Sequence, residues 1–425
     1  MRPWRPKGIV SAGRSFPPWV VLWAWIRQAL DPDPSCNKAL ARINAHRAGL
    51  GLSPASTDTG GYCKARQRLP EGFFRRLWRR LGASVSEGTR QEDLWHGRVV
   101  KVVDGSSSSM PDTAANQRIY PQPSVQKEGC GFPVVAFVGV FCLATGAVLD
   151  LALGAWMLHD LSLFAFLLRA FSPGDVVLAD RAYCAYAHLA LLKMRGVDVV
   201  VRLHQRRAVD FRRGRVVGML DHIVTWSRPV LPSRSMRLKV FRRLPQSLRV
   251  REIRFRVETK GFRPQAITLA TTLLDARAYP VEDLADLYAR RWQVELHFRD
   301  LKTTLAMDVL RGKSPDIVRK EIHVHLLAYN LVRAMICEAA IHSGLRPRRI
   351  SFKGTLQHVA AHADLFTHYR AHAHRPAFTA LLDLVAQQII PHRPSRVEPR
   401  VRKRRPKSYP LMTRPRAQLK AELGA

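Results

Sequence analysis

The stretch Asp286–Leu305 concentrates side chains that could do chemistry. Tyr288, Arg291, Glu295 and Lys302 follow the spacing Y-x2-R-x3-E-x6-K. On an α-helix, steps of three, four and seven residues keep these side chains near one face. A carboxylate there can hold a metal cation, while a guanidinium and an ammonium can bind phosphate. The alternative interpretation is a solvated helix with an i,i+4 ion pair between Arg291 and Glu295.

The same stretch contains no Pro or Gly, and its apolar residues recur at helical spacing. This pattern predicts one amphipathic helix. Its apolar side would pack on the rest of the fold and hold the acidic residue in place. The apolar residues concerned are Leu287, Val294, Phe298, Leu301 and Leu305.

Two further carboxylates follow short apolar runs that read as strands. Arg98–Val103 ends at Asp104 and a Gly-Ser turn, and Asp175–Ala179 ends at Asp180. Functional sites of open α/β sheets form at the carboxyl ends of strands. We therefore expect both acids at one sheet edge, with an irregular loop over Ser106–Gln126.

The segments around these acids predict the order β-β-β-α-β-α-β. The right-handed crossover rule favours the fourth strand lying parallel beside the first, which would make Asp104 and Asp180 neighbours. The remaining predicted elements are a hairpin of Val134–Leu143 and Ala147–Leu153, helices over Leu158–Phe171 and Ala185–Met194, and a strand over Val197–Leu203.

Charge indicates the class of partner. The 425 residues include 69 Lys and Arg against 33 Asp and Glu, a formal net charge of +36. Such an excess favours a polyanion, most simply DNA or RNA. The alternative is a basic protein from an Arg-biased genome. Because 47% of residues are hydrophobic, the chain is long and apolar enough for two or three folded domains.

Cysteine spacing and apolar runs bear on location. The six cysteines form no C-x2-C pair, which is typical of free thiols in a reducing compartment. Trp19–Ile26 is too short to span a membrane. Phe132–Trp156 is long enough, but Thr145-Gly146 and Asp150 interrupt it, so two strands fit better. These features predict a cytoplasmic protein without a membrane segment.

The N-terminal and C-terminal regions are both basic but differ in predicted structure. Residues 1–95 read as a helical DNA-recognition domain, and residues 393–425 as a basic Pro-rich tail. Solvated helical faces are the alternative for residues 1–95. The core is predicted over residues 96–203 and 281–392, with helices over Pro315–Ser343, Thr355–His362 and Ala377–Ile389.

Residues 204–280 interrupt the α/β pattern as a β-rich insertion with dense cations. Alternation along Arg249–Arg256 predicts a basic strand face that follows a phosphate backbone. A charged edge sheet is the alternative. Strands are predicted over Met236–Phe241, Val250–Val257 and Gln265–Thr272, and the cations are Arg206, Arg207, Arg212, Arg213, Arg215, Arg242, Arg243, Arg249, Arg251, Arg254 and Arg256.

Three carboxylates, Asp104, Asp180 and Glu295, suit hard divalent cations. Mg²⁺ prefers oxygen ligands and is often held by carboxylates together with substrate phosphate. A pair of such ions can stabilise both the attacking and the leaving oxygen of an in-line displacement. Phosphodiester chemistry depends mainly on this charge neutralisation and on positioning.

These residues resemble those of bacterial DDE transposases of the insertion-sequence-four family, the branch with a Y-R-E-K signature. The most specific matches are the Y-x2-R-x3-E-x6-K pattern, D-G-S at Asp104 and D-R-x-Y at Asp180–Tyr183. Framing phrases are similar as well: Lys127–Val134, Leu273–Pro280 and Tyr329–Arg333.

The resemblance implies an α/β, RNase H-like mixed sheet with helices on both faces, interrupted by the β-rich insertion. It implies that Asp104, Asp180 and Glu295 bind two Mg²⁺ (or Mn²⁺) ions. DNA contacts are expected from Tyr288, Arg291, Lys302, Arg181 and Tyr183. In related enzymes a Trp of the insertion stacks on a flipped base, and Trp226 is the candidate here, with a plain core position as the alternative.

The resemblance also implies cut-and-paste transposition through a hairpin on the transposon end. The partners would be double-stranded transposon ends with inverted repeats and target DNA. A homodimer is expected in the synaptic complex, and the protein would be associated with the nucleoid. Two alternatives remain open: an RNase H-like nuclease without strand transfer, and a non-catalytic transposase-derived DNA-binding protein.

Overall fold

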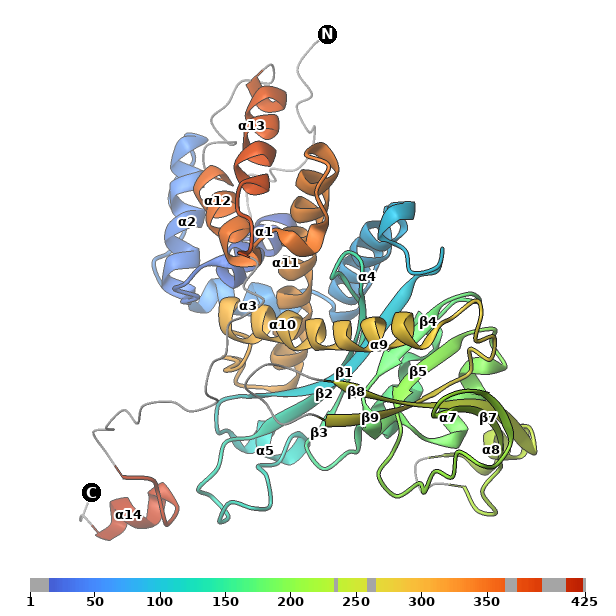
Figure 1. Cartoon of the computed structure of the whole chain (residues 1–425). Coiled ribbons are helices and arrows are strands. Elements are labelled where there is room, and N and C mark those ends of the chain that lie inside the picture. Colours follow the sequence, from blue (N-terminus) through green and yellow to red (C-terminus); the bar gives the residue numbers. More distant parts are fainter. Residues whose placement is uncertain (1–14, 233–235, 258–264, 364–372, 392–409, 423–425) are drawn as a thin grey trace.

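A mixed β-sheet forms the centre of the molecule (Figure 1). The structure is a computed structural model and describes residues 15–232, 236–257, 265–363, 373–391 and 410–422. In these ranges nine strands form one sheet in the order β3-β2-β1-β4-β5-β9-β8-β7-β6. The strands are β1 Val100–Ser109, β2 Val134–Cys142, β3 Val148–Ala155, β4 Val176–Ala179, β5 Asp198–Arg202, β6 Arg215–Gly218, β7 Asp221–Ser227, β8 Ser247–Val257 and β9 Gln265–Thr271.

The first five strands have the predicted arrangement. β1 runs antiparallel to β2, which forms a hairpin with β3. β4 lies parallel beside β1, with Val103 opposite Ala179, and β5 lies parallel beside β4. The sequence prediction that the fourth strand pairs with the first is confirmed, and the apolar run Phe132–Trp156 contains the two strands of the hairpin.

The insertion extends this sheet. β9 pairs antiparallel with β5, and β8, β7 and β6 follow outward. Of the three strands predicted there, two are confirmed as β8 and β9, but Met236–Phe241 is wrong because Leu238–Arg242 forms helix α8. Backbone hydrogen bonds therefore continue from the core into the insertion.

Helices cover both faces of the sheet, confirming the RNase H-like α/β class. On one face a large hydrophobic core joins the sheet to α4 (Glu71–Glu87), α9 (Val281–Ala289), α10 (Gln293–Arg299) and α11 (Pro315–His342). On the other face a second core joins it to α6 (Asp160–Phe164), α7 (Tyr186–Lys193) and α8. Figure 1 shows α9 and α10 lying across the sheet.

The N-terminal helices α1 (Pro18–Leu30), α2 (Cys36–Gly49) and α3 (Gly60–Arg68) share a third core with α11. Helix α4 is tied to the core by side-chain contacts that include those of Trp78 and Arg79. Trp78 Nε1 donates to His323 Nδ1 at 3.1 Å, and Arg79 pairs with the buried Asp150 of β3. The domain boundary at residue 95 stays a prediction, although these contacts join the helices on its N-terminal side to the core.

Several local predictions differ from the structure. Leu158–Phe171 is not one helix but α6 followed by a 3-10 turn over Ala165–Ala170. Ser106–Gln126 is not all loop, because β1 continues to Ser109 in pairing with β2 and α5 occupies Ala114–Ile119. Helices α12 (Phe352–Ala363), α13 (His374–Ala386) and α14 (Arg416–Glu422) complete the described chain. Residues 393–409 of the predicted tail lie outside the described residues.

Helix α11 is the one described helix long and apolar enough to cross a membrane. Its most apolar window is 67% buried inside the protein. It contacts α1, α4, α12 and α13, so its apolar surface is used in the core.

Candidate active site

The signature residues lie on a helical segment that departs from α-helical winding at two places. Helix α9 passes through a 3-10 turn at Arg290–Trp292 into α10, which ends in a π-turn at Asp300–Thr304. The sequence predicted a uniform helix over Asp286–Leu305. The helical path is confirmed, but its start is five residues earlier, at Val281. Single π-turns inside helices are frequent at functional sites.

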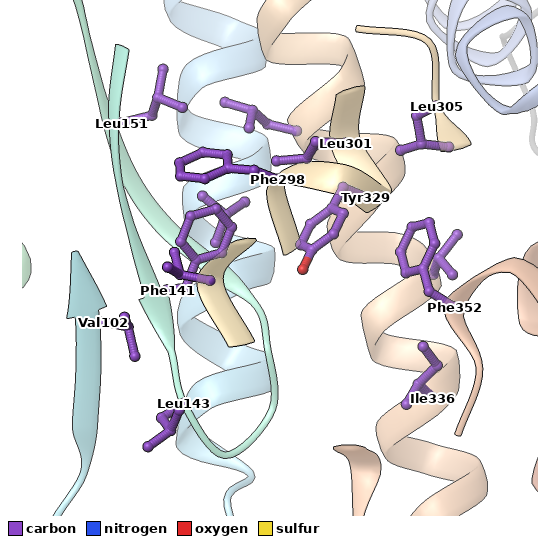
Figure 2. Packing of buried hydrophobic residues seen from close by; sticks show 14 of the residues in the cluster. Val102, Phe141, Leu143, Leu151, Phe298, Leu301, Leu305, Tyr329, Ile336 and Phe352 are labelled. Carbon is purple, nitrogen blue, oxygen red and sulfur yellow. The ribbon is translucent and has the colours of Figure 1, made fainter. Parts of the chain in front are cut away.

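The apolar side of this segment is buried as predicted. Leu287, Val294 and Leu301 are fully buried in the core shared with α11. Figure 2 shows Phe298 and Leu301 among the side chains of that core, together with Phe141 and Tyr329. The rings of Phe298 and Phe141 meet edge to face, with centroids 5.1 Å apart. This packing fixes the helix over β2.

Polar contacts fix the same helix along its axis. Arg333 of α11 donates to Asp300 Oδ2 and His297 Nδ1, both at 2.9 Å. Tyr329 accepts from Arg333 Nε and donates to the carbonyl of Gly146, in the β2–β3 turn. Burial and the Arg333 charge hold the pKa of His297 well below its usual value, so the ring is a neutral acceptor. The phrase Tyr329–Arg333 therefore anchors the helix that carries Glu295.

Asp104 and Asp180 come one residue after the paired residues Val103 and Ala179 of β1 and β4. They are consequently neighbours across a parallel pair. Asp180 follows the end of β4 as predicted, and its Oδ1 accepts from the Ala182 amide at 2.8 Å. Asp104 was predicted to end its strand, but it lies in mid-strand because β1 continues against β2, with Asp104 opposite Gly139.

Arg291 lies between two of the three acids. Its guanidinium nitrogens are 3.8 Å from Asp104 Oδ2 and 3.8 Å from Glu295 Oε1. Both distances are longer than a good hydrogen bond. The side chain is buried, and its Nε has no hydrogen-bond partner in the described part of the chain. The cation is thus held loosely by both carboxylates.

The acids repel one another. Burial, followed by the charges of Asp180 and Glu295, raises the pKa of Asp104 to about 6, against the lowering effects of the Gly105 amide and Arg291. A carboxyl group whose pKa stays high beside an arginine is incompletely neutralised. The electrostatics of this site favour an additional cation.

The other two signature residues, Lys302 and Tyr288, lie beside the same group of acids. Lys302 Nζ lies 3.2 Å from Ser106 Oγ, two residues beyond Asp104 on β1. Tyr288 is buried, and the pKa of its phenol is raised by burial while Arg291 and Arg202 oppose that shift. Lys302 and Arg291 therefore place two positive charges beside the acids.

Three predicted DNA contacts have different surroundings. Arg181 is exposed and donates to Gln205 Oε1 at 2.9 Å, so it can reach a ligand. Tyr183 is only 2% exposed, and this position does not allow direct DNA contact. Trp226 is also buried, donates to Glu252 Oε1 at 2.8 Å, and has the Arg207 guanidinium 3.7 Å from its ring centre. In this conformation Trp226 is a core residue of the insertion, and the predicted base stacking would require it to leave.

The basic strand face predicted for Arg249–Arg256 is corrected at one position. Arg251 is fully buried and forms a forked ion pair with Asp221. Arg249 and Arg256 are exposed, but they are seven residues apart in a strand whose pairing has no register shift, so they lie on opposite faces and do not form one basic face.

Sequence reasoning missed one carboxylate beside the site. Asp160 begins α6, and burial followed by the charge of Asp180 raises its pKa. Its position after the β2–β3 hairpin gives no spacing signal, and only the fold brings it to β1.

The donor set fits divalent cations. In the described ranges no three Asp, Glu, His or Cys side chains already lie close enough to hold a metal ion. At the present site Arg291 lies between Asp104 and Glu295. The hard oxygen donors and the raised pKa of Asp104 match a cation that would replace the guanidinium.

An RNase H-like sheet with carboxylates on β1, after β4 and on α10 defines a class of enzymes that act on nucleic-acid phosphodiesters. Comparison with known proteins specifies the class. Residues 95–331 match the family model described as "Transposase DDE domain". The chain belongs to this family, whose members cleave DNA, transfer strands and depend on divalent metal ions.

The similar proteins are transposases. Transposase InsG for insertion sequence element IS4 of Escherichia coli strain K12 is 26% identical over 93% of this chain and 87% of its own length. This match supports membership of the insertion-sequence-four group. The transposase for insertion sequence element IS421 of Escherichia coli is 41% identical over 16% of this chain and 18% of its own. A piggyBac transposase synaptic complex with hairpin DNA aligns at 8% identity and TM-score 0.44, covering 89% of this chain and 79% of that one.

Proposed function

We propose that this DDE transposase moves an insertion sequence by cut-and-paste transposition, with Asp104, Asp180 and Glu295 as its catalytic carboxylates. The observation that carries the proposal is the loose position of Arg291 between Asp104 and Glu295. Two Mg²⁺ or Mn²⁺ ions held by the three acids would neutralise charge on the attacked phosphodiester.

The side chains around the acids would bind the DNA backbone. An arriving phosphate would compete with Asp104 and Glu295 for the guanidinium of Arg291, which offers a planar fork to phosphate oxygens. Lys302, 3.2 Å from Ser106, is placed to bind the same phosphate group or the next one. Tyr288 lies under the guanidinium, with 5.8 Å between the Arg291 Cζ atom and its ring centre, and limits where Arg291 can turn.

The reaction would begin with water attacking the phosphodiester at a transposon end, which frees a 3′-hydroxyl. That hydroxyl would attack the opposite strand to form a hairpin, and after hairpin opening the end would join target DNA. The substrates would be terminal inverted repeats. Because two ends must be joined, a homodimer is proposed for the synaptic complex, acting in the cytoplasm at the nucleoid without a membrane.

Conservative amide variants test whether Asp104, Asp180 and Glu295 are the catalytic carboxylates. Asp104→Asn, Asp180→Asn and Glu295→Gln should each lose strand cleavage of the element's own end by about a thousandfold or more, since positioned electrostatic groups contribute on that scale. Binding of the same DNA should remain. Normal cleavage by Glu295→Gln would show that the assignment is wrong.

A nuclease without strand transfer is the second candidate. Pre-cut ends supplied with a target plasmid separate the two functions. Joined products support transposition, whereas hydrolysis alone supports the nuclease.

A further inference from the structure

The face of β1 opposite Glu295 carries its own polar group. Asp104 shares one strand face with Val102 and Ser106, and the Val102 side chain is in the core of α10. Gly105 and Val103 belong to the other face, and Val103 is in the core of α6. Asp160 meets the strand from that second face. Glu295 and Asp160 thus approach the Asp104–Asp180 pair from opposite sides of the sheet.

Asp160 packs directly on Gly105. A Cβ atom at residue 105 would lie 2.7 Å from Asp160 Oδ2, which is closer than real contacts allow. The carboxylate accepts no hydrogen bond and forms no ion pair within the part of the chain that the structure describes. It also lines a cavity of about 470 Å³ together with Gly105, Ser106 and Ala182. A ligand could therefore reach it from solvent.

Tyr183 supplies an independent observation. Its side chain is 98% buried (2% exposed), and its hydroxyl has no hydrogen-bond partner among the described residues. The ring meets Phe164 of α6 edge to face, with centroids 5.5 Å apart. Burial raises the pKa of the Tyr183 phenol, and the charges of Asp160, Asp104 and Asp180 raise it further. A buried hydroxyl without a partner is costly unless a ligand or its water uses it.

We propose that Asp160 is a fourth metal-binding carboxylate and that, with Asp104 and Asp180, it forms the second of two cation positions. Glu295 completes the first position from the α10 side of β1, and Asp160 completes the second from the α6 side. The Tyr183 hydroxyl would hold a water of the second ion. This inference rests on the proposed function. The proposed function assigns two ions to the three acids, and the inference gives each ion its own position.

Manganese binding tests the assignment of the acids to two cation positions without a measurement of DNA cleavage. The full chain is titrated with Mn²⁺ at pH 7.5 while free Mn²⁺ is followed by electron paramagnetic resonance. Asp160→Asn should weaken one of two bound ions about tenfold or more and leave the other unchanged. Glu295→Gln should weaken the other ion, and Asp104→Asn should weaken both. Glu87→Gln, an exposed acid at the end of α4, is the matched control and should titrate as wild type.

Two further variants should weaken binding of the ion at the second position by different means. Gly105→Ala keeps every charge but forces Asp160 away from its position, and it should weaken the ion that Asp160→Asn weakens. Tyr183→Phe should do so more mildly while leaving the metal-free fold as stable as wild type. Circular dichroism confirms that each variant is folded.

The outcomes separate this inference from the proposed function. If Asp160→Asn and Gly105→Ala titrate as wild type while Glu295→Gln and Asp104→Asn lose Mn²⁺, the fourth carboxylate is refuted and the catalytic assignment stands. If none of these variants changes Mn²⁺ binding, both are refuted.

Discussion

Two buried arginines in this protein meet carboxylates in opposite ways. Arg251 of the insertion forms a fork with Asp221, at 2.8 Å from Nε to Oδ1 and 2.6 Å from Nη2 to Oδ2, and its Nη1 donates to the Tyr279 carbonyl at 2.7 Å. Arg291 of the catalytic helix lies 3.8 Å from each of two acids and leaves Nε without a partner in the described structure.

The difference separates a structural ion pair from a binding site. A buried charge is tolerated when its partner and hydrogen bonds are complete, as at Arg251. Where the contacts are loose, as at Arg291, little is lost when a phosphate replaces the carboxylates, and the released carboxylates can take a metal ion. The Arg251–Asp221 pair therefore stabilises the fold, whereas Arg291 can exchange its carboxylate partners for a phosphate.

The largest expected effect on stability comes from Arg251→Met. It leaves Asp221, 2% exposed, without a cation and should reduce the free energy of unfolding by about 3–5 kcal/mol. Chemical denaturation at pH 7.5 measures the loss. The double variant Arg251→Met with Asp221→Leu should recover most of it, and failure to recover would mean that Arg251 acts mainly through Tyr279.

The second effect has the opposite sign and depends on pH. The pKa of Asp104 is about 6 in the folded chain, against an ordinary value of 3.8, so the folded state keeps the proton to higher pH. Ionised Asp104 therefore destabilises the fold fully above pH about 6, and this cost disappears as pH falls towards 3.8. Asp104→Asn should gain about 2–3 kcal/mol at pH 7.5 and almost nothing at pH 4. Denaturation of the metal-free protein at both pH values checks this, and a loss at pH 7.5 would contradict the contrast with Arg251.

The substitution Trp226→Phe tests whether Trp226 has only a structural role in the core of the insertion. The substitution removes one hydrogen bond to buried Glu252, which keeps His222 as a partner at 2.9 Å. The expected loss is about 1–2 kcal/mol of unfolding free energy. If Trp226 stays in the core during the reaction, hairpin formation on transposon ends should be unchanged. A large loss of hairpin product in a stably folded variant would instead support base stacking by Trp226.

Arg291→Met should have the smallest effect on stability, about 1 kcal/mol or less, because its contacts are loose. Cleavage should nevertheless fall by about a hundredfold, since a charged phosphate contact is lost. Arg299→Met on the same helix is the control, because that side chain is exposed and should retain cleavage. A stability loss as large as that of Arg251→Met would show that Arg291 is a structural ion-pair partner like Arg251.

The sequence predicted the parts of the fold that depend on local pattern. Alternation and β-branched runs gave the order of β1 to β5, and crossover handedness placed β4 beside β1. Helical spacing gave the buried side of α9–α10 through Leu287, Val294 and Leu301. The three signature acids were recognised from spacing and family resemblance, and their catalytic role is still to be tested.

What the sequence missed depends on contacts between distant segments. Arg251 follows the exposed Arg249 at the two-residue spacing of a strand, and only its ion pair with Asp221 of β7 distinguishes it. Met236–Phe241 has a strand-like composition, but packing of Phe241 and Leu244 beneath the sheet favours a short helix. Asp160 has no motif, and it reaches β1 because α6 packs under Gly105.

The pairing of β9 with β5 has a consequence for how this fold can change. Without β9, the apolar strand Asp198–Arg202 would be the border of the sheet, with open hydrogen-bonding groups and a row of valines. Such a border recruits strands from other molecules and leads to aggregation. The insertion therefore acts as a cover for the sheet as well as a spacer before Glu295. A shortened transposase of this design would have to keep a strand in the position of β9, whatever else it discarded.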